Sequence, residues 1–194
     1  MNDPRNITGI ILAGGKSSRM GREKGLILLD GKPFIQHGID ALQPLVDTII
    51  IVSSNSDYDV FEVDRVEDII VESGPLAGLH SGLMHSKTEH NLVISCDVPL
   101  ITTEFLKKLL YYKKEDYDIV QFEAEGKSIP LIALYKKRCA DQCQELLANG
   151  ERRLRKLVST VKTKTITVLD KERVLVTNMN TVEDLKTITN AIDH

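Results

Sequence analysis

The chain has 194 residues, of which 42% are hydrophobic, and this is enough to bury the core of one domain spanning residues 1–194. Its formal net charge of −3 excludes a general nucleic-acid or membrane-surface binder, because such proteins need a basic excess. No stretch approaches the roughly 20 apolar residues of a membrane span, and the polar start lacks the apolar part of a signal peptide. Three cysteines without a paired framework fit a reducing compartment. We therefore expect a cytoplasmic protein.

The first predicted element is a strand that leads into a glycine-rich, cationic loop. Residues 7–12 form an aliphatic, β-branched run, which is typical of a strand buried on both faces. Three small residues follow it: Ala13, Gly14 and Gly15. They leave no bulky side chain between the backbone N–H groups and a ligand. Further on, Arg19 offers a planar fork that matches a phosphate, and Lys24 offers a compact charge on a long stem. The segment predicts a loop that holds a triphosphate, and an ordinary glycine turn with incidental charges is the alternative.

Spacing excludes two common phosphate-binding loops. A Walker A loop requires G-x-x-x-x-G-K-[ST], whereas Gly15 and Gly21 are separated by five residues and no Gly-Lys-Ser or Gly-Lys-Thr follows. A dinucleotide-binding fingerprint requires G-x-G-x-x-G and an acidic residue after the second strand. Here Gly14 and Gly15 are adjacent, and the second predicted strand ends in Ser53-Ser54-Asn55.

The rest of the chain alternates predicted strands and helices. Strands are expected at 48–52, 68–71, 91–96, 119–122, 129–135 and 163–169. Helices are expected at 33–46, 76–86, 105–110, 137–147, 154–158 and 182–192. This order predicts an α/β fold: a Rossmann-like, mostly parallel sheet with helices on both faces. Gly126 indicates an excursion between two strands at that point and not a further strand-helix-strand unit.

Ligands of such a sheet bind at the carboxyl ends of its strands. Asp97 directly follows the apolar run 91–96, where a carboxylate is costly unless it is paired or binds a metal. Beside a triphosphate the natural occupant is Mg²⁺, which takes one or two carboxylates and completes its shell with water and phosphate oxygens. The alternative is that Asp97 caps the next helix. Because the phosphate loop precedes it in the same sheet, we favour the metal.

Five segments carry a resemblance to a known family: Leu12-Ala13-Gly14-Gly15-x-x-x-Arg19-Met20-Gly21-x-x-Lys24-Gly25, Gly74-Pro75-Leu76-Ala77-Gly78, Cys96-Asp97-x-Pro99, Ser128-Ile129-Pro130-Leu131 and Asn178-x-Asn180-Thr181-x-Glu183-Asp184-Leu185. Over nearly the whole chain they resemble the molybdenum cofactor guanylyltransferase family of the nucleotidyltransferase superfamily. The first motif is shared across that superfamily, and the Asn-x-Asn-Thr ending points to the molybdopterin branch. The resemblance implies a nucleotide-diphospho-sugar transferase-like fold. It also implies transfer of GMP from Mg·GTP to molybdenum-loaded molybdopterin, which forms the guanine dinucleotide form of the cofactor and releases pyrophosphate.

The same resemblance implies roles for individual residues. The implied catalytic residues are Arg19, Lys24 and Asp97, with Mg²⁺ held by Asp97. The implied nucleotide contacts are Leu12, Ala13, Gly14, Gly15, Lys24, Asn55, Asp68, Gly78 and Asp97. Within this set, Asn55 and Asp68 are expected on the guanosine side, with Glu72 as the alternative to Asp68. Asn178 and Asn180 lie two apart before a predicted helix N-terminus and are expected to bind the acceptor, with a merely polar turn as the alternative.

The chemistry implied by the resemblance requires cations more than a general base. The attacking phosphate monoester is already ionised, and the attacked triphosphate is also anionic. Two alternatives stay open: a molybdopterin cytidylyltransferase or other small nucleotidyltransferase, and a non-catalytic GTP-binding protein that delivers the cofactor. The expected partners are GTP and molybdopterin, followed by molybdopterin-insertion proteins and molybdoenzymes, with neither nucleic acid nor membrane.

Overall fold

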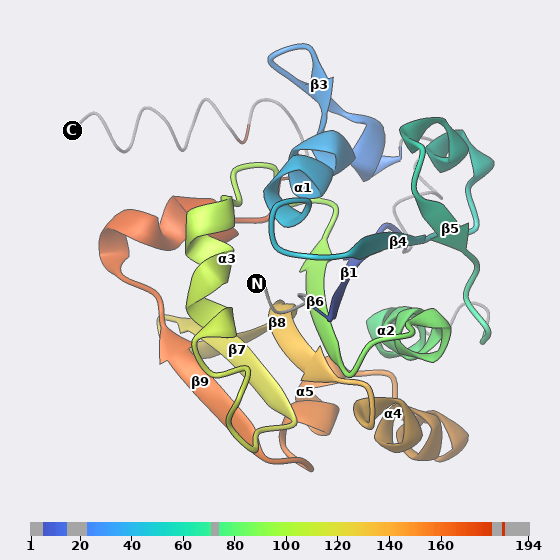
Figure 1. The fold of residues 1–194 in the computed structure, drawn as a ribbon, viewed down its shortest axis with the longest axis vertical. Helices are drawn as coiled ribbons and strands as arrows, with labels where there is room; N and C mark the ends of the chain where they lie inside the picture. The colour runs from blue at the N-terminus through green and yellow to red at the C-terminus, as the bar shows by residue number, and fades with distance from the viewer. Residues whose placement is uncertain (1–5, 15–22, 71–73, 180–183, 185–194) are drawn as a thin grey trace.

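The computed structural model describes residues 6–14, 23–70, 74–179 and 184, and the sheet at its centre orders seven strands as β5-β4-β1-β6-β8-β7-β9 (Figure 1). The strands are β1 (Ile7–Leu12), β4 (Thr48–Val52), β5 (Asp64–Val66), β6 (His90–Ser95), β7 (Ile119–Ala124), β8 (Lys127–Lys136) and β9 (Thr163–Thr167). Within the described part of this seven-stranded sheet, β8 is antiparallel to both of its neighbours, and the other paired strands are parallel to each other. The mostly parallel α/β sheet is therefore confirmed.

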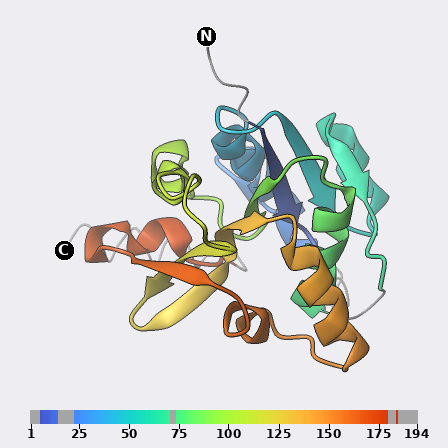
Figure 2. The same cartoon turned by 60° about the horizontal axis from the view of Figure 1, so that its bottom comes forward.

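Helices cover both faces of this sheet (Figures 1 and 2). One face carries α1 (Phe34–Leu42) and α3 (Thr103–Leu110), and the other carries α2 (Gly74–His85), α4 (Cys139–Ala148) and α5 (Leu154–Val158). Alternate residues of β1 divide between the faces as a pleated strand requires: Ile11 joins the core under α1 and α3, whereas Ile10 and Leu12 join the core under α2. Among the described residues, no helix combines the length and apolar character that crossing a bilayer requires.

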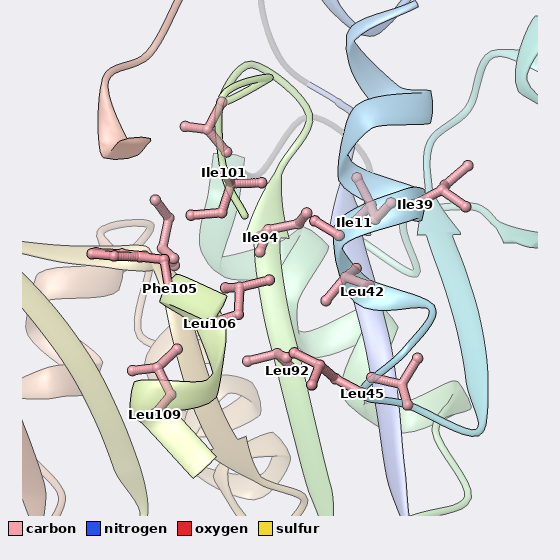
Figure 3. Packing of buried hydrophobic residues seen from close by; sticks show 14 of the residues in the cluster. Ile11, Ile39, Leu42, Leu45, Leu92, Ile94, Ile101, Phe105, Leu106 and Leu109 are labelled. Atoms are coloured by element: carbon pink, nitrogen blue, oxygen red, sulfur yellow. The ribbon is translucent and has the colours of Figure 1, made fainter. Parts of the chain in front are cut away.

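Figure 3 shows how the core under α1 and α3 is packed. Ile11 of β1 and Ile94 of β6 lie beside Ile39 and Leu42 of α1, and Leu106 of α3 packs against the same strands. All five side chains are buried. Fully burying one such aliphatic side chain stabilises the fold by about 1.5–3 kcal/mol relative to leaving it exposed. The helical spacing of these apolar residues thus fixes which face of each helix meets the sheet.

The predicted strand at 68–71 is wrong. The third strand of the parallel half is β5, and it pairs with β4 from Asp64 opposite Ile50 to Val66 opposite Val52. Ile69, in the segment predicted as a strand, is 51% exposed and contributes nothing to the core. An edge strand is paired on one side alone, so its sequence carries little of the apolar signal that marks a central strand. Val71 lies outside the described residues.

Several short elements have no counterpart in the sequence prediction. They are η2 (Lys24–Leu26), β2 (Leu28–Leu29), β3 (Lys32–Pro33), η3 (Ser56–Phe61) and η4 (Asp170–Val176). β2 and β3 form a small separate hairpin that leads directly into α1. The predicted helix at 182–192 lies outside the described residues, apart from residue 184.

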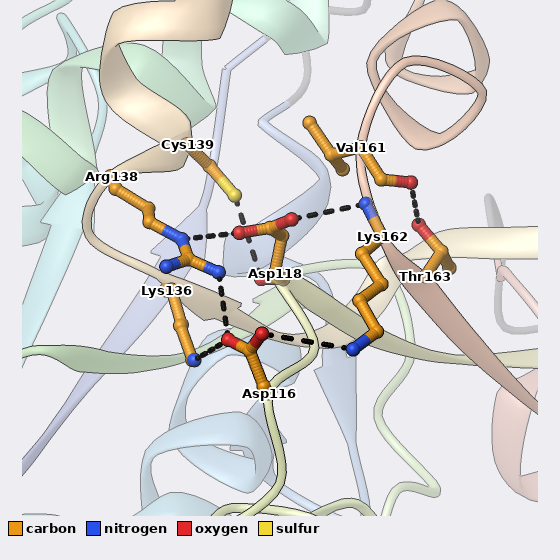
Figure 4. A network of polar contacts seen from close by, with 8 residues as sticks. All are labelled: Asp116, Asp118, Lys136, Arg138, Cys139, Val161, Lys162 and Thr163. Carbon is orange, nitrogen blue, oxygen red and sulfur yellow. Dashed lines mark hydrogen bonds and ion pairs between the residues drawn. The ribbon is translucent and has the colours of Figure 1, made fainter.

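A charged network at the amino-terminal end of β7 fastens β9 to the sheet (Figure 4). The Asp118 carboxylate accepts hydrogen bonds from the Arg138 side chain and, at 3.0 Å, from the Lys162 backbone N–H. The Asp118 N–H in turn donates to the Lys162 carbonyl oxygen at 2.8 Å. Asp116 pairs with Lys136 at 3.2 Å. The network lies at the strand end opposite the predicted site, so its role is in the fold.

Candidate functional site

The carboxyl ends of three neighbouring parallel strands, β4, β1 and β6, meet at one edge of the sheet. Backbone pairing continues one residue beyond the strands. The Cys96 N–H donates to the Leu12 carbonyl oxygen at 3.1 Å, and the Ala13 N–H donates to the Val52 carbonyl oxygen at 3.0 Å. These bonds hold the start of the predicted phosphate loop beside Asp97, at the edge where ligands of such sheets bind.

Gly14 is the last residue of this loop that the structure describes before the gap. It is exposed, and a Cβ added to it would meet no heavy atom of the described residues within 4 Å. The backbone at this position therefore borders open space, where a ligand can approach it closely. Gly15 and Arg19 lie outside the described residues, and their roles stay predictions.

Asp97 is a buried carboxylate, 8% exposed, and both of its oxygens have polar neighbours. The Ser95 hydroxyl donates to Oδ1 at 2.6 Å, and the Lys24 Nζ lies 3.7 Å from Oδ2. A carboxylate removed from water is stable only when such partners compensate its charge. The alternative that Asp97 caps the next helix is wrong, because the N-cap of α3 is Thr102, whose hydroxyl accepts from the Phe105 N–H at 3.3 Å.

Lys24 reaches Asp97 from a short 3₁₀ turn. The turn is closed by backbone hydrogen bonds from Leu26 to Glu23 and from Ile27 to Lys24, each 3.1 Å long. The side chain of Lys24 is 27% exposed, so its ammonium borders both the carboxylate and the solvent. The structure thus brings together the two described residues of the predicted catalytic set.

Asp68 lies at the opposite side of the strand ends, beside Gly78 and Leu12. Its Oδ1 is 3.5 Å from the position of a Cβ added to Gly78, and Leu12 Cδ2 is 3.6 Å from that position. This Oδ1 is buried and has no hydrogen-bond partner among the described residues. Burial raises the pKa of the Asp68 carboxyl above its usual value. A buried acceptor without a partner points to a ligand donor at this place. The alternative residue, Glu72, lies outside the described residues.

Asn55 follows β4 and its side chain is engaged locally. Its Oδ1 accepts from the Asp57 N–H at 2.9 Å and caps η3, and its Nδ2 donates to the Asp57 carboxylate at 3.3 Å. A contact from Asn55 to a nucleoside stays a prediction.

On the acceptor side, Asn178 is exposed and Met179 beside it is fully buried. Met179 forms a small separate core with Leu29 of the β2–β3 hairpin and Phe34 of α1. Its backbone N–H donates to the Asp97 carbonyl oxygen at 2.7 Å. The backbone beside Asn178 is therefore bonded to the backbone of Asp97, and Asn180 lies outside the described residues.

The described residues contain no group of three His, Cys, Asp or Glu side chains that could hold a metal ion. A single carboxylate such as Asp97 fits the requirement of Mg²⁺, which keeps several waters and is bound through one or two carboxylates together with substrate phosphates. It does not fit a structural zinc site, which needs four protein ligands. Burial, together with the neighbouring Asp97 carboxylate, raises the pKa of the Cys96 thiol to about 12, which disfavours the nucleophilic thiolate.

A family model described as a MobA-like NTP transferase domain matches residues 9–166. The chain belongs to this family. It is 37% identical over 179 residues to a probable molybdenum cofactor guanylyltransferase of Flavobacterium johnsoniae, covering 92% of this chain and 94% of that protein. It is 34% identical over 192 residues to a molybdenum cofactor guanylyltransferase of Vibrio parahaemolyticus, covering 95% and 96%. A crystal structure of molybdopterin-guanine dinucleotide biosynthesis protein A from Archaeoglobus fulgidus shares the fold, with a TM-score of 0.78 at 24% identity over 96% of this chain and 98% of that one.

Two residues of this MobA-like site have no place in the sequence prediction. Ser95 contacts Asp97 directly, and its position as the last residue of β6, two residues before Asp97, is a signal that could have found it. Tyr58 contacts the turn that carries Lys24. No local pattern marks Tyr58, because the contact joins segments far apart in the sequence.

Proposed function

We propose that the chain transfers GMP from GTP to molybdenum-loaded molybdopterin, forming the guanine dinucleotide form of the molybdenum cofactor. The observation that carries the proposal is the pairing of Lys24 with Asp97 at the strand ends, 3.7 Å apart. It joins a cation suited to a triphosphate and a carboxylate suited to Mg²⁺ in one place. The curated relatives named as molybdenum cofactor guanylyltransferases, at 34% and 37% identity, support the choice of substrates.

In the proposed reaction, an oxygen of the terminal phosphate of molybdopterin attacks the α-phosphorus of GTP. A new P–O bond forms, the bond between the α-phosphorus and the α,β-bridging oxygen breaks, and pyrophosphate leaves with that oxygen. The attacking phosphate is already ionised near neutral pH, so no side chain has to remove a proton. The chain must instead hold two anions together and compensate the charge on the leaving group.

Lys24, together with Arg19, would supply positive charge to the triphosphate. Asp97 would hold Mg²⁺, which when bound neutralises phosphate charge and orients the phosphates. The Ser95 hydroxyl holds the Asp97 carboxylate in place by a 2.6 Å hydrogen bond. The carboxylate would therefore need no rearrangement to hold the metal.

The remaining predicted contacts divide between the nucleotide and the acceptor. The backbone from Leu12 to Gly15 would face the phosphates. Asp68, beside Gly78, would accept a hydrogen bond from the guanosine, because its buried Oδ1 has no partner among the described residues. Asn178 and Asn180 would bind the molybdopterin. We propose a cytoplasmic protein of one domain whose product passes to molybdopterin-insertion proteins and molybdoenzymes.

Pyrophosphate release with molybdenum-loaded molybdopterin and each of the four nucleoside triphosphates tests the proposal. We expect release with GTP, and protection from thermal unfolding by GTP but not by CTP. A ligand at 100 times its dissociation constant stabilises the native state by about 2.7 kcal/mol, which such a comparison resolves. Preference for CTP would identify a cytidylyltransferase. GTP binding without pyrophosphate release would identify a delivery protein.

A further inference from the structure

Tyr58 is a fully buried tyrosine whose hydroxyl lies against the turn that carries Lys24. The hydroxyl donates to Glu23 Oε2 at 3.2 Å. A Cβ added to Gly25 would lie 2.6 Å from that oxygen, so the turn and the phenol are in direct contact. Tyr58 therefore touches the residues on both sides of Lys24.

The turn is short, and two backbone hydrogen bonds close it. η2 has three residues, and its N-cap, Glu23, makes no side-chain capping bond. Tyr58, by contrast, stands in η3, which Asn55 caps directly after β4, and its ring packs in the main core with a centroid 6.2 Å from that of Phe61. The Tyr58 ring is thus anchored in the main core, and the turn that carries Lys24 is positioned by its contact with the Tyr58 hydroxyl.

The phenol keeps its proton in the physiological pH range. Burial, helped by the nearby Cys96 and Glu23, raises the pKa of Tyr58 well above its usual value, so the phenol stays a neutral donor. Loss of the hydroxyl would remove its hydrogen bond to Glu23.

We infer that Tyr58 is a positioning residue, which fixes the turn so that the Lys24 ammonium stands beside Asp97. The inference rests on the proposed function, in which Lys24 binds the triphosphate. Tyr58 itself does not touch the reacting atoms. Its effect on GTP binding therefore passes through Lys24, and this distinguishes positioning from a contribution to the fold alone.

A double-mutant cycle tests the inference. Tyr58→Phe removes the hydroxyl and keeps the ring, and Lys24→Ala removes the ammonium. GTP affinity and thermal unfolding are measured for the wild type, both single variants and the double variant. We expect Tyr58→Phe to weaken GTP binding about three- to tenfold in the wild-type background, the worth of one ordinary hydrogen bond. In the Lys24→Ala background the same change should have no further effect on GTP affinity.

Tyr135→Phe is the matched control. Tyr135 is also fully buried, and its hydroxyl donates a single hydrogen bond of 2.7 Å, to the Pro130 carbonyl oxygen. This variant should lower the unfolding temperature as Tyr58→Phe does and leave GTP affinity unchanged. Glu23→Gln, which keeps an acceptor for the phenol, should retain most of the wild-type affinity.

The outcomes separate the inference from the function on which it rests. If Lys24→Ala weakens GTP binding and Tyr58→Phe does not, or if Tyr58→Phe weakens it equally in both backgrounds, the positioning role is overturned and the assignment of Lys24 stands. If Lys24→Ala leaves GTP affinity unchanged, the assignment of Lys24 fails, and the inference fails with it.

Discussion

The backbone N–H of Met179 donates to the carbonyl oxygen of Asp97 across 2.7 Å. This bond ties a segment near the end of the described chain to Asp97, two residues beyond the end of β6. The side chain of Met179 is buried and that of Asn178 beside it is exposed, so the backbone bond also sets the direction in which Asn178 faces. The proposed acceptor side and the proposed metal ligand are thus positioned relative to one another by one hydrogen bond.

Asp97→Asn should preserve the fold and remove most of the activity. Asparagine has the same shape and can still accept from Ser95, but it carries no charge for Mg²⁺, whose contribution to such transfers is several kcal/mol. We expect kcat to fall at least about a hundredfold at saturating Mg²⁺, with circular dichroism unchanged. Ser95→Ala, which leaves the carboxylate in place, should cost about 10–100-fold in metal affinity. Turnover of Asp97→Asn at the wild-type rate would show that the metal ligand lies elsewhere.

Lys24→Ala should weaken GTP binding. A charge-assisted contact to the triphosphate contributes about 1.5–3 kcal/mol, which corresponds to a loss of roughly 10- to 150-fold in affinity by titration calorimetry. Lys32→Ala is the control, because Lys32 lies on the nearby hairpin and pairs with Asp40 at 2.7 Å on an exposed surface. That variant should bind GTP as the wild type does. An equal loss in both variants would mean that general charge, and not Lys24, attracts the nucleotide.

Replacement of Asn178 and Asn180 by alanine should raise the KM for molybdopterin and leave GTP affinity nearly intact. The two asparagines are proposed to bind the acceptor, so their loss removes interactions that the nucleotide does not use. Steady-state kinetics with varied acceptor, together with GTP titration, check the separation. Parallel losses of acceptor and GTP binding would assign this segment to the fold.

Asp68→Asn should stabilise the protein at neutral pH and weaken GTP binding. Burial raises the folded-state pKa of Asp68, so the protonated form contributes stability that is present below the unfolded pKa and lost as pH rises through the folded pKa. Asparagine removes this loss because it never ionises. Chemical denaturation should show the variant more stable than the wild type at pH 7, with the difference shrinking as pH falls through the raised folded pKa of Asp68 and staying constant below its unfolded pKa of about 4. A wild type that is as stable as the variant at every pH would contradict the buried, unpartnered carboxylate.

The central part of the fold and of the site could be predicted because its signals are local. The apolar, β-branched runs at 7–12 and 48–52 coincide with β1 and β4, since strands buried on both faces must be apolar throughout. Asp97 could be placed because the carboxyl ends of parallel strands gather at one edge. These rules depend on short segments and on the direction of the strands alone.

The remainder depends on contacts that no local pattern encodes. The edge strand β5 is short, pairs with β4, and carries a charged residue, Arg65, that donates to Asp59 and to the Ser53 carbonyl oxygen, so it lacks the apolar run that marks a central strand. Ile69 suggested a strand and is exposed instead. The contact of Tyr58 with Glu23 joins two loops, and its partners become neighbours only once the sheet has formed.

The small core of Leu29, Phe34 and Met179 is separate from the two cores that hold the sheet. A cluster of this size contributes little cooperativity, so it can open without the strands coming apart. Native-state hydrogen exchange should therefore show the hairpin amides and the Met179 amide exchanging together, well before those of β1 and β6. The cluster of Leu29, Phe34 and Met179, beside which the acceptor is proposed to bind, would then unfold locally while the central sheet stays folded.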